Sequence, residues 1–441
     1  MRKGDFDVVV IGAGFGGMCA AARLAHRGYK TLVVERLSLL GGRCSTLVHE
    51  GFKITTGAMA IPGGGVIEET FREVGAAFNV RRFDPVNVYL FEGKYYAWPL
   101  GESMARAFYE FGRDKDGVNR VLEAMARAVT WQTPVGPISV REWLSQYTED
   151  EHIYQVFQPL CTVVLGQNIH GLPISELFKF MTSGQPAQEI ATWNYAVNGN
   201  IDLIQSLARA IEEKGGEIWK NAEAKRIIVD QHRVTGAVVE TSEGEWEISA
   251  KAVVSNLGPK KTVEITGREH FDRAYLRELE FVQPTSLIVT SYVISDHPLV
   301  EYPGIIWPVG SPNMVCHLSP TLTCPELAPE GKHFLYSGSG ITEPRTSPID
   351  IKSEIKLHLE ELNRLIPDVE KRGKVLSVQC FQGDWPLYHS MWHTLPQRTP
   401  VVDLYNVGDG VRISGLIGVN LCAETARIVS EDIMSRIEPT G

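Results

Sequence analysis

A glycine-rich turn near the start of the chain constrains the fold more than any other segment. Residues 7–11 form a short apolar run rich in Val, which is typical of a parallel strand covered on both faces. Gly12, Gly14 and Gly17 follow with the spacing G-x-G-x-x-G. The first glycine permits a tight turn, the second lets backbone amides approach a pyrophosphate, and the third lets the next helix pack closely on the strand. The segment therefore predicts an α/β domain with a dinucleotide site.

The residues after this turn extend the motif but do not identify the dinucleotide. A helix expected over 16–26 would point its N-terminal amides at the phosphates. A second Val-rich strand, 31–35, ends in Glu35, where the motif expects an acid that binds ribose hydroxyls and repels a 2′-phosphate. NAD and FAD share this ADP half, so both remain compatible with the motif. The alternative is a glycine turn that serves only close packing of the helix.

A second glycine pair directly after Glu35 favours FAD over NAD. Gly41 and Gly42 allow the backbone to follow a buried cofactor closely along its pyrophosphate and flavin half. Arg43 could offer a fixed cation to the diphosphate, or a bidentate fork to a carboxylate that braces the loop. A surface turn with a solvated arginine is the alternative reading of this stretch.

A glycine-acid turn near the other end of the chain is the stronger indication. A short strand expected over 404–407 leads into Gly408 and Asp409, whose carboxylate could accept hydrogen bonds from ribityl hydroxyls. A helix expected from residue 415 to about residue 437 would offer amides and a positive dipole end to the pyrimidine edge of an isoalloxazine. The residues expected at that edge are Gly418, Val419 and Asn420. By itself, the Gly-Asp-Gly turn is also common on protein surfaces.

Together these motifs resemble the large FAD-binding superfamily that contains flavin amine oxidases, phytoene desaturases and related carotenoid or polyene oxidoreductases. Residues 198–256 are similar to the segment in which that family's chain returns to the cofactor domain. The resemblance implies an α/β fold, with an FAD-binding Rossmann-like domain of the GR2 type and an inserted α+β substrate domain. It further implies FAD contacts, which we expect at Arg36, Gly57, Ala58, Met59, Ala224 and Asn256.

Within that superfamily, the sequence resembles the desaturase-like branch more than the amine oxidases. The stretch GFKITTGAMAIPGGG, 51–65, stands where that branch has a glycine-ended strand entering the flavin pocket. The family's frequent Asp before that glycine is replaced by Thr55 or Thr56, so one binding detail differs. Many amine oxidases have a lysine at the reactive edge of the flavin, but no lysine of this sequence can be placed there. An amine oxidase is therefore less favoured and stays an alternative.

The three cofactor blocks lie far apart in the sequence, so the cofactor domain is expected to be discontinuous. Its predicted parts are residues 1–95, 196–267 and 396–441. The insertion 96–195 shows apolar residues at helical spacing and predicts a helical cap, which could alternatively form a homodimer surface. The insertion 268–395 carries β-branched and alternating runs that predict an antiparallel floor, with one helix around 353–365.

Candidate catalytic and substrate-binding residues lie near the points where the chain re-enters the cofactor domain. Aromatic side chains there could line a slot over the flavin, and a tyrosine or histidine could polarise a carbonyl or remove a proton. The catalytic candidates are Tyr195, Tyr388 and His389, and the substrate-binding candidates are Ile61, Trp193, Trp385 and Trp392. The alternative is that these aromatic clusters belong to an ordinary core or interface.

Composition excludes several other classes of protein. The formal net charge is −10 and no basic run occurs, so no nucleic-acid partner is expected. Seven scattered cysteines without a Cys-x-x-Cys pair indicate reduced thiols in a cytoplasmic protein, and no metal site is expected. No stretch reaches the roughly 18 apolar residues of a spanning helix, so no integral membrane segment is expected.

The sequence therefore predicts an FAD-dependent oxidoreductase that removes two electrons, as hydride to flavin N5, from a mostly apolar small molecule. C–C desaturation is the favoured reaction, and oxygen or a quinone is the expected electron acceptor. An amine oxidase acting on a C–N bond is one alternative, and a flavin-dependent saturase or isomerase is another. A third is a non-catalytic binding protein similar to Rab escort and dissociation-inhibitor proteins.

Overall fold

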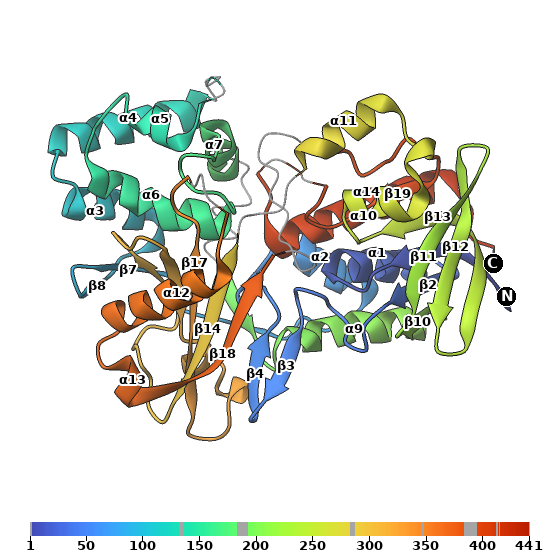
Figure 1. The fold of residues 1–441 in the computed structure, drawn as a ribbon, viewed down its shortest axis with the longest axis horizontal. Helices are drawn as coiled ribbons and strands as arrows, with labels where there is room; N and C mark the ends of the chain where they lie inside the picture. Colours follow the sequence, from blue (N-terminus) through green and yellow to red (C-terminus); the bar gives the residue numbers. More distant parts are fainter. Residues whose placement is uncertain are drawn as a thin grey trace.

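A computed structural model describes residues 2–131, 136, 138–182, 193–282, 287–344, 348–382, 395–411, 413 and 415–440 of the chain. Within these residues, two large β-sheets stand side by side, each with helices packed on it (Figure 1). Both chain ends lie at the outer edge of the half that contains the first sheet.

The Val-rich run that predicts a buried strand lies at the centre of the first sheet. The strand order is β10-β2-β1-β13-β12-β11, and β19 pairs with β13. Neighbours among β10, β2, β1, β13 and β19 are parallel, whereas β11 and β12 continue the sheet as an antiparallel hairpin. The strand bounds are β1 Arg2–Ile11, β2 Thr31–Glu35, β10 Glu217–Lys220, β11 Glu223–Asp230, β12 Arg233–Thr241, β13 Gly244–Ser255 and β19 Leu404–Asn406.

Side chains of the central strand alternate between two apolar clusters, because successive strand residues point to opposite faces. Val8 and Val10 pack in one cluster with α1, α2, α9 and α14, whereas Val9 and Ile11 belong to the cluster on the other face. The helices of this half are α1 Phe15–His26, α2 Gly65–Val74, α9 Asn200–Glu213, α10 Pro259–Thr266, α11 Arg273–Phe281 and α14 Gly418–Arg436, with a 3₁₀ turn at Arg268–His270. The predicted α/β class is thus confirmed.

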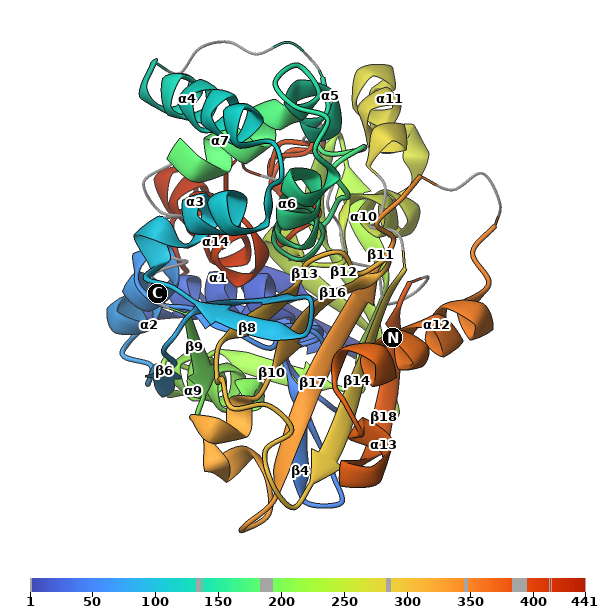
Figure 2. The same cartoon turned by 90° about the vertical axis from the view of Figure 1, so that its left-hand side faces the viewer.

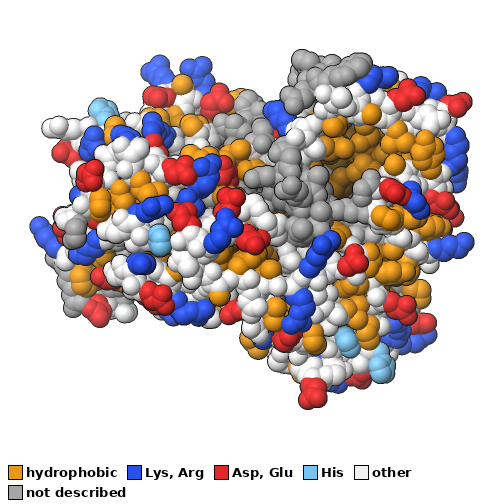
Figure 3. Space-filling model, turned by 180° about the vertical axis from the view of Figure 1, so that it is seen from behind, with side chains coloured by type: hydrophobic (Ala, Val, Ile, Leu, Met, Phe, Trp, Pro, Cys, Tyr) orange, Lys and Arg blue, Asp and Glu red, His pale blue; other side chains and the backbone are white. Residues whose placement is uncertain are grey.

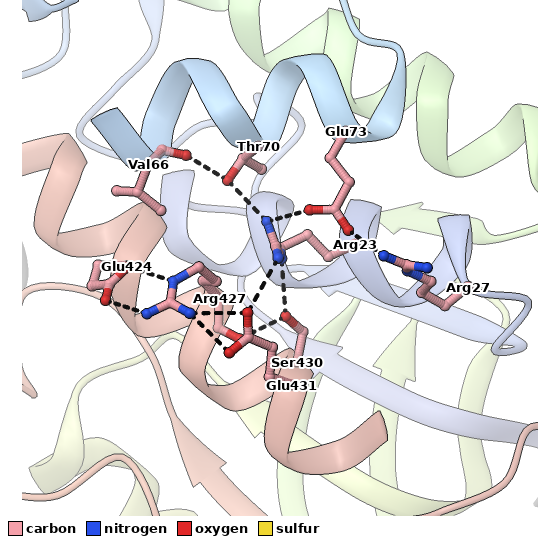
Figure 4. Close-up of polar contacts among 9 residues, drawn as sticks. All are labelled: Arg23, Arg27, Val66, Thr70, Glu73, Glu424, Arg427, Ser430 and Glu431. Atoms are coloured by element: carbon pink, nitrogen blue, oxygen red, sulfur yellow. Dashed lines mark hydrogen bonds and ion pairs between the residues drawn. The ribbon is translucent and has the colours of Figure 1, made fainter. Parts of the chain in front are cut away.

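A buried arginine joins three of these helices (Figure 4). Arg23 on α1 is 5% exposed, and its guanidinium lies 2.7 Å from Glu73 of α2. Its Nε donates a hydrogen bond to Ser430 of α14 at 3.1 Å. A buried cation is tolerated only when it is paired and hydrogen-bonded. These contacts therefore fix α14 against α1, the two helices whose N-terminal ends face the candidate site.

The second sheet has the order β18-β14-β17-β16-β15-β7-β8 and is antiparallel except where β15 pairs with β7. Helices α3–α7 cover one face, and α12 covers the other (Figure 2). Tyr292 and Tyr336 point into the cluster under α3–α7, whereas Val293 and Leu335 point toward α12. The second half is therefore a mixed sheet with one parallel pair, and the helices of the segment predicted as a helical cap lie on one of its faces.

The other helices and strands of the described chain belong to the second sheet, its helices and two small sheets. The strands of the second sheet are β7 Asn87–Phe91, β8 Lys94–Ala97, β14 Ile288–Ser295, β15 Ile305–Pro308, β16 Met314–Leu318, β17 His333–Gly340 and β18 Gly373–Phe381. Its helices are α3 Leu100–Phe111, α4 Lys115–Trp131, α5 Val140–Leu144, α6 Glu151–Val164, α7 Ile174–Thr182, α12 Ile351–Leu365 and α13 Val369–Arg372, with 3₁₀ turns at Pro320–Leu322 and Pro325–Leu327. There are two small sheets in the described part of the chain. One pairs β3 Thr46–His49 with β4 Phe52–Thr55, and the other is formed by β5 Ile61–Pro62, β6 Val80–Arg82 and β9 Trp193–Ala196.

Three predicted boundaries differ from the structure. The boundary between residues 95 and 96 falls inside β8, because β7 pairs with β15 and brings β8 into the second sheet. Residues 268–282 pack on the first sheet instead of joining the second, since Phe271 lies in the same cluster as Val9. The helix expected from Gly415 begins at Gly418, because Ile417 just before it is extended, with a φ of −140° and a ψ of 161°.

The described cysteines are reduced, and charges of both signs mix on the surface. All seven cysteines lie in the described ranges, and each is a free thiol. On the face drawn in Figure 3, Lys and Arg side chains are interspersed with Asp and Glu. Within the described part of the chain, no helix combines the length and apolar character needed to cross a bilayer.

Candidate functional site

The glycine-rich turn brings α1 against β1 as closely as its sequence predicts. Gly12 has a φ of +93°, which side chains with a Cβ rarely adopt. A Cβ on Gly17 would lie 2.2 Å from the Gly12 carbonyl oxygen, so α1 could not approach β1 with any other residue there. Gly17 therefore serves helix packing, whereas Gly12 and Gly14 lie on the wall of a cavity.

The Asn256 side chain lies where the loops from the two ends of the chain meet. A Cβ on Gly14 would lie 2.3 Å from Asn256 Nδ2, and one on Gly408 would lie 2.7 Å from Asn256 Oδ1. A Cβ on Gly16 would lie 3.1 Å from the Gly408 backbone nitrogen. Glycine at all three positions thus lets the turn after β1 and the turn after β19 share one amide side chain.

Glu35 is held by the backbone of both neighbouring loops. Its Oε2 accepts a hydrogen bond from the Ala13 amide at 2.8 Å, and its Oε1 accepts one from the Leu37 amide at 2.9 Å. The carboxylate lines the cavity and retains acceptor positions, because an ionised carboxylate has about four lone-pair sites. Glu35 is therefore positioned to accept further hydrogen bonds from hydroxyl groups in the cavity.

Arg43 and Asp409 join the second glycine loop to the loop near the other end of the chain. The guanidinium forms a bidentate pair with the carboxylate at 2.5 and 2.7 Å. Of the two roles open to Arg43 from sequence, the structure shows the fork that braces the loop. Both side chains are partly buried, with 28% and 13% exposure, so the pair is shielded from most solvent screening.

Two helix N-termini open onto the same cavity. α1 begins after Gly14 and α14 begins after Ile417, and neither has a side-chain cap or an acidic residue in its first turn. The first amides of a helix have no intrahelical partner, and the dipole places partial positive charge there. Both ends can therefore donate hydrogen bonds to anionic or electron-rich groups.

The cavity has a volume of about 660 Å³ and spans both halves of the molecule. Its glycine end is formed by the loops at 12–16, 41–44, 57–59 and 407–409, with β11 and α10 at the far side. Its apolar wall is formed by side chains of the second sheet and the residue before α14. The apolar wall consists of Ile288, Ile305, Val315, Leu318, Phe381 and Ile417.

Most of the predicted contact residues line this cavity. They are Gly12, Gly14, Glu35, Arg36, Gly42, Arg43, Gly57, Ala58, Met59, Trp193, Ala224, Asn256, Asp409, Gly418 and Val419. Gly408 adjoins the cavity through Asn256, and its amide donates a hydrogen bond to Thr425 Oγ1 at 2.9 Å. Asn420 is fully buried behind the start of α14, and its side-chain amide has no hydrogen-bond partner in the part of the chain that the structure describes.

Of the predicted catalytic and substrate-binding residues that the structure describes, Ile61 and Tyr195 lie away from the cavity wall. Ile61 is fully buried in the cluster that contains Val66 of α2, so it is a core residue and does not reach a substrate. Tyr195 is 1% exposed, stacks on Phe83 with ring centroids 4.4 Å apart, and donates a hydrogen bond to the Pro303 carbonyl at 2.5 Å. The predicted catalytic role does not fit this placement, because the hydroxyl is committed to the core.

The other aromatic candidates, Trp385, Tyr388, His389 and Trp392, lie outside the described residues.

Sequence reasoning missed the residues that form the apolar wall. They come from strands whose alternation predicts a sheet but does not show which face meets the cofactor half. Tyr336, Gly338 and Cys316 also line the cavity, together with Thr162 and Val163 of α6. The one signal for them was the small-residue run SGSG, 337–340, inside an otherwise bulky strand.

The cavity thiols are held in the protonated form. Burial raises the pKa of Cys316 and of Cys422 to about 12, and it raises that of Cys44 further. The thiolate is the nucleophilic form of cysteine, so these groups are unreactive at neutral pH. The cavity therefore offers no cysteine nucleophile among its described residues.

Comparison with known proteins agrees with this geometry. A family model described as flavin containing amine oxidoreductase matches residues 15–434. An uncharacterized protein from Methanocaldococcus jannaschii is 25% identical, over 93% of this chain and 95% of the relative. A neurosporene-forming phytoene desaturase from Cereibacter sphaeroides is 23% identical, over 98% of this chain and 94% of the relative.

Other relatives match over a smaller part of their length. A chloroplastic prolycopene isomerase from Daucus carota is 23% identical over 76% of this chain, which spans 61% of the isomerase. Among solved structures, an oxidoreductase from Methanosarcina mazei has a TM-score of 0.84 and 26% identity, covering 96% of this chain and all of that one.

Proposed function

The chain belongs to the flavin-containing amine oxidoreductase family, and from this premise we propose that it is an FAD-dependent oxidoreductase that desaturates a C–C bond of a mostly apolar substrate. The observation that carries this proposal is the continuity of the cavity. A glycine end with charged groups and free helix amides passes directly into an apolar wall.

The glycine end fits FAD residue by residue. Gly12, Gly14 and Gly42 leave backbone at the wall where any Cβ would be strained or would occupy the space. Glu35 offers acceptor sites for ribose hydroxyls, and the first amides of α1 suit a pyrophosphate. The N-terminal amides of α14 suit the electron-rich edge of the flavin ring. Bound FAD would supply the hydride acceptor of the reaction.

The protein's own contribution at the apolar wall is to orient the substrate and to exclude water. Branched and aromatic side chains from the second sheet form this surface, including Ile288, Ile305 and Phe381. Removing water from around a reacting C–H bond also prevents hydrolysis and side reactions. Oxygen or a quinone would then accept the electrons.

The charges along the described lining favour a neutral substrate. The lining carboxylates are Glu35, Glu223, Glu264 and Asp409, and all lie in the cofactor half. In the part of the second sheet that the structure describes, the cavity wall contains no carboxylate or lysine. Burying an ammonium group without a counter-ion is costly, so this wall suits a hydrocarbon or a neutral oxygenated molecule.

Amine oxidation is the second candidate. The description of the matching family names amines, and the aromatic residues Trp193, Tyr336 and Phe381 line the cavity. Aromatic faces attract cations within about 6 Å, which could substitute for a carboxylate. A binding protein without catalysis is disfavoured, because such a protein has no need for glycines that open the wall to a nucleotide.

An anaerobic substrate screen tests the proposal. Purified protein would be mixed with polyenes, alicyclic ketones and amines of similar size, and bleaching of the flavin absorption would be followed without oxygen. We expect bleaching by a polyene or ketone, with a product two mass units lighter. Bleaching by amines alone, with an imine or aldehyde product, would replace desaturation with amine oxidation.

A further inference from the structure

One corner of the apolar wall carries hydroxyl groups. Gly338 on β17 pairs with Thr290 on β14 and with Cys316 on β16. Cross-strand partners point to the same face of a sheet, and Tyr336, two residues before Gly338, shares that face. We call these four residues, Thr290, Cys316, Tyr336 and Gly338, the Gly338 corner.

The side chains of this corner converge on the missing side chain of the glycine. A Cβ on Gly338 would lie 3.0 Å from Cys316 Sγ and 3.9 Å from the Tyr336 hydroxyl oxygen. Gly338, Cys316 and Tyr336 all line the cavity. Because Gly338 carries no side chain, the Tyr336 hydroxyl and the Cys316 thiol face the same point of the cavity.

The corner also contains an unsatisfied hydroxyl. Thr290 is 1% exposed, and among the described residues its Oγ1 meets no partner within hydrogen-bond criteria. Its neighbour is the Tyr336 hydroxyl, and of these two residues it is Tyr336 that lines the cavity. A buried hydroxyl without a partner costs about 1–3 kcal/mol, and such a group in a native protein commonly marks a water or ligand position.

The electrostatic surroundings select what can satisfy it. Burial is the main cause that raises the pKa of Tyr336 well above its ordinary value of 10.0, so the phenol stays a neutral donor. Ile288 and Leu318, on the neighbouring strands, are apolar, and the hydroxyl of the adjoining wall residue Ser339 is bonded to His358 Nδ1 at 2.8 Å. A neutral oxygen in the cavity can accept a hydrogen bond from the Tyr336 hydroxyl, whose oxygen can in turn accept one from Thr290. A hydrocarbon would leave the Tyr336 O–H without a partner in the cavity, and an ammonium would meet no counter-charge on the described wall.

We propose that the Gly338 corner binds a neutral oxygen atom of the substrate, a ketone or ester carbonyl, with the Tyr336 hydroxyl as the hydrogen-bond donor. This inference rests on the proposed function, because it places an oxygenated apolar molecule against the same wall. It narrows the substrate class from apolar molecules in general to those with one carbonyl group. It also fixes which end of the molecule lies deepest against the second sheet.

Three ligands with one carbon frame test the proposal. Cyclohexylcyclohexane, 4-cyclohexylcyclohexanone and 4-cyclohexylcyclohexylamine would be titrated by calorimetry into the protein as purified, with its flavin content measured in the same samples. We expect the ketone to bind about tenfold more tightly than the hydrocarbon, as one or two hydrogen bonds would provide. Tyr336→Phe should weaken ketone binding about three- to tenfold and leave hydrocarbon binding unchanged.

Two variants guard against a general loss of structure. Thr290→Val keeps the shape of the side chain and should also weaken ketone binding selectively, which tests the corner even if Tyr336→Phe fails to fold. Tyr154→Phe removes a buried tyrosine hydroxyl that bonds to Thr148 in the helical layer, away from the cavity, and should change neither affinity.

The outcomes separate the corner from the proposed function. The corner proposal would be overturned if ketone and hydrocarbon bound equally to the wild-type protein. It would also be overturned if both Tyr336→Phe and Thr290→Val kept the full preference for the ketone. In either case, a flavin bound to the protein would leave the oxidoreductase proposal intact. Tighter binding of the amine than of the ketone would also overturn it. A selective ketone loss in a protein without flavin would support the corner and refute the oxidoreductase.

Discussion

The two ends of the cavity are built from different parts of the chain. Backbone forms most of the glycine end, whereas side chains form the apolar wall. The glycine end uses loops in which a Cβ would clash or be strained, as at Gly14 and Gly408, and two of these loops are joined by the ion pair of Arg43 with Asp409. The apolar wall instead uses one face of regular strands. Backbone amides and carbonyls bind a nucleotide whatever the neighbouring side chains are, whereas substrate choice depends on exchangeable side chains such as Ile288. One end of the cavity can therefore stay constant while the other adapts.

The buried polar groups of the two halves also differ in how they respond to acid. In the first sheet, Asp7 lies 2.7 Å from Lys251, and hydrogen bonds from Lys251, Thr440 and Lys30 outweigh burial and lower its pKa to about 2. In the second, burial lowers the pKa of His358 from 6.5 to about 4. The contribution of Asp7 to stability is present above pH 3.8 and is lost only as the pH falls toward 2. The second sheet should therefore weaken first on acidification.

The largest expected effect concerns the glycine end. Gly17→Ala places a methyl group 2.2 Å from the Gly12 carbonyl oxygen, which forces α1 away from β1. We expect a loss of about 3 kcal/mol in the free energy of unfolding, at the upper end of overpacking effects, and loss of bound flavin. Urea unfolding and the flavin-to-protein absorbance ratio measure both. Gly136→Ala, where no described atom beyond its chain neighbours lies within 4 Å of the added methyl, should change stability by less than about 0.5 kcal/mol; equal effects of the two variants would refute the close-packing role.

The next effect tests the acid response of the second sheet. His358 contacts Ser339 Oγ at 2.8 Å and Ser291 Oγ at 2.7 Å. Below pH 6.5 the unfolded chain binds a proton that the folded chain takes up only near pH 4, so the free energy of unfolding should fall by about 3 kcal/mol across that range. His358→Gln should remove this part of the slope, measured by urea unfolding at a series of pH values. An unchanged slope would mean that His358 is not buried in its neutral form.

A smaller effect concerns the pair that joins the two loops. Arg43→Met leaves the Asp409 carboxylate partly buried without its cation, and we expect a loss of about 2 kcal/mol in stability together with weaker flavin binding. Arg120→Met removes an exposed pair with Asp114 and should cost less than about 1 kcal/mol. If both variants behaved alike, the loops would not depend on the Arg43–Asp409 pair.

The smallest effect tests the reassignment of Tyr195. Tyr195→Phe removes one hydrogen bond to the Pro303 carbonyl and should cost about 1 kcal/mol in the free energy of unfolding. The rate of flavin reduction should stay at the wild-type value, as followed by stopped-flow absorbance. A large drop in that rate would restore the catalytic role that the sequence predicts for this residue.

The two ends of the cavity differ in how far the sequence predicts them, for a physical reason. At the glycine end, backbone conformation is set by residue type over a few positions, so β2 spans the predicted 31–35 and Glu35 lies on the cavity wall. The Arg43–Asp409 pair joins residues 366 positions apart, so the sequence predicts an ion pair with a carboxylate only as one of two possible roles of Arg43.

The apolar wall was not predictable from the sequence. A strand pattern gives two faces but not which of them meets the other domain, so Tyr336 and Cys316 were missed. The pairing of β7 with β15 joins segments about 200 residues apart, which is why the domain boundary near residue 95 was misplaced. The catalytic role predicted for Tyr195 does not fit the structure, because a position near a domain crossing does not show where a side chain points.

The central claim is that glycine loops from the two ends of the chain close on one FAD molecule. The direct test is to denature the purified protein, identify the released nucleotide by chromatography, and measure its amount per chain. The account predicts FAD at one molecule per chain, with less in Gly17→Ala and the wild-type amount in Gly136→Ala. A colourless protein that releases no nucleotide and takes up none when FAD is added would contradict it.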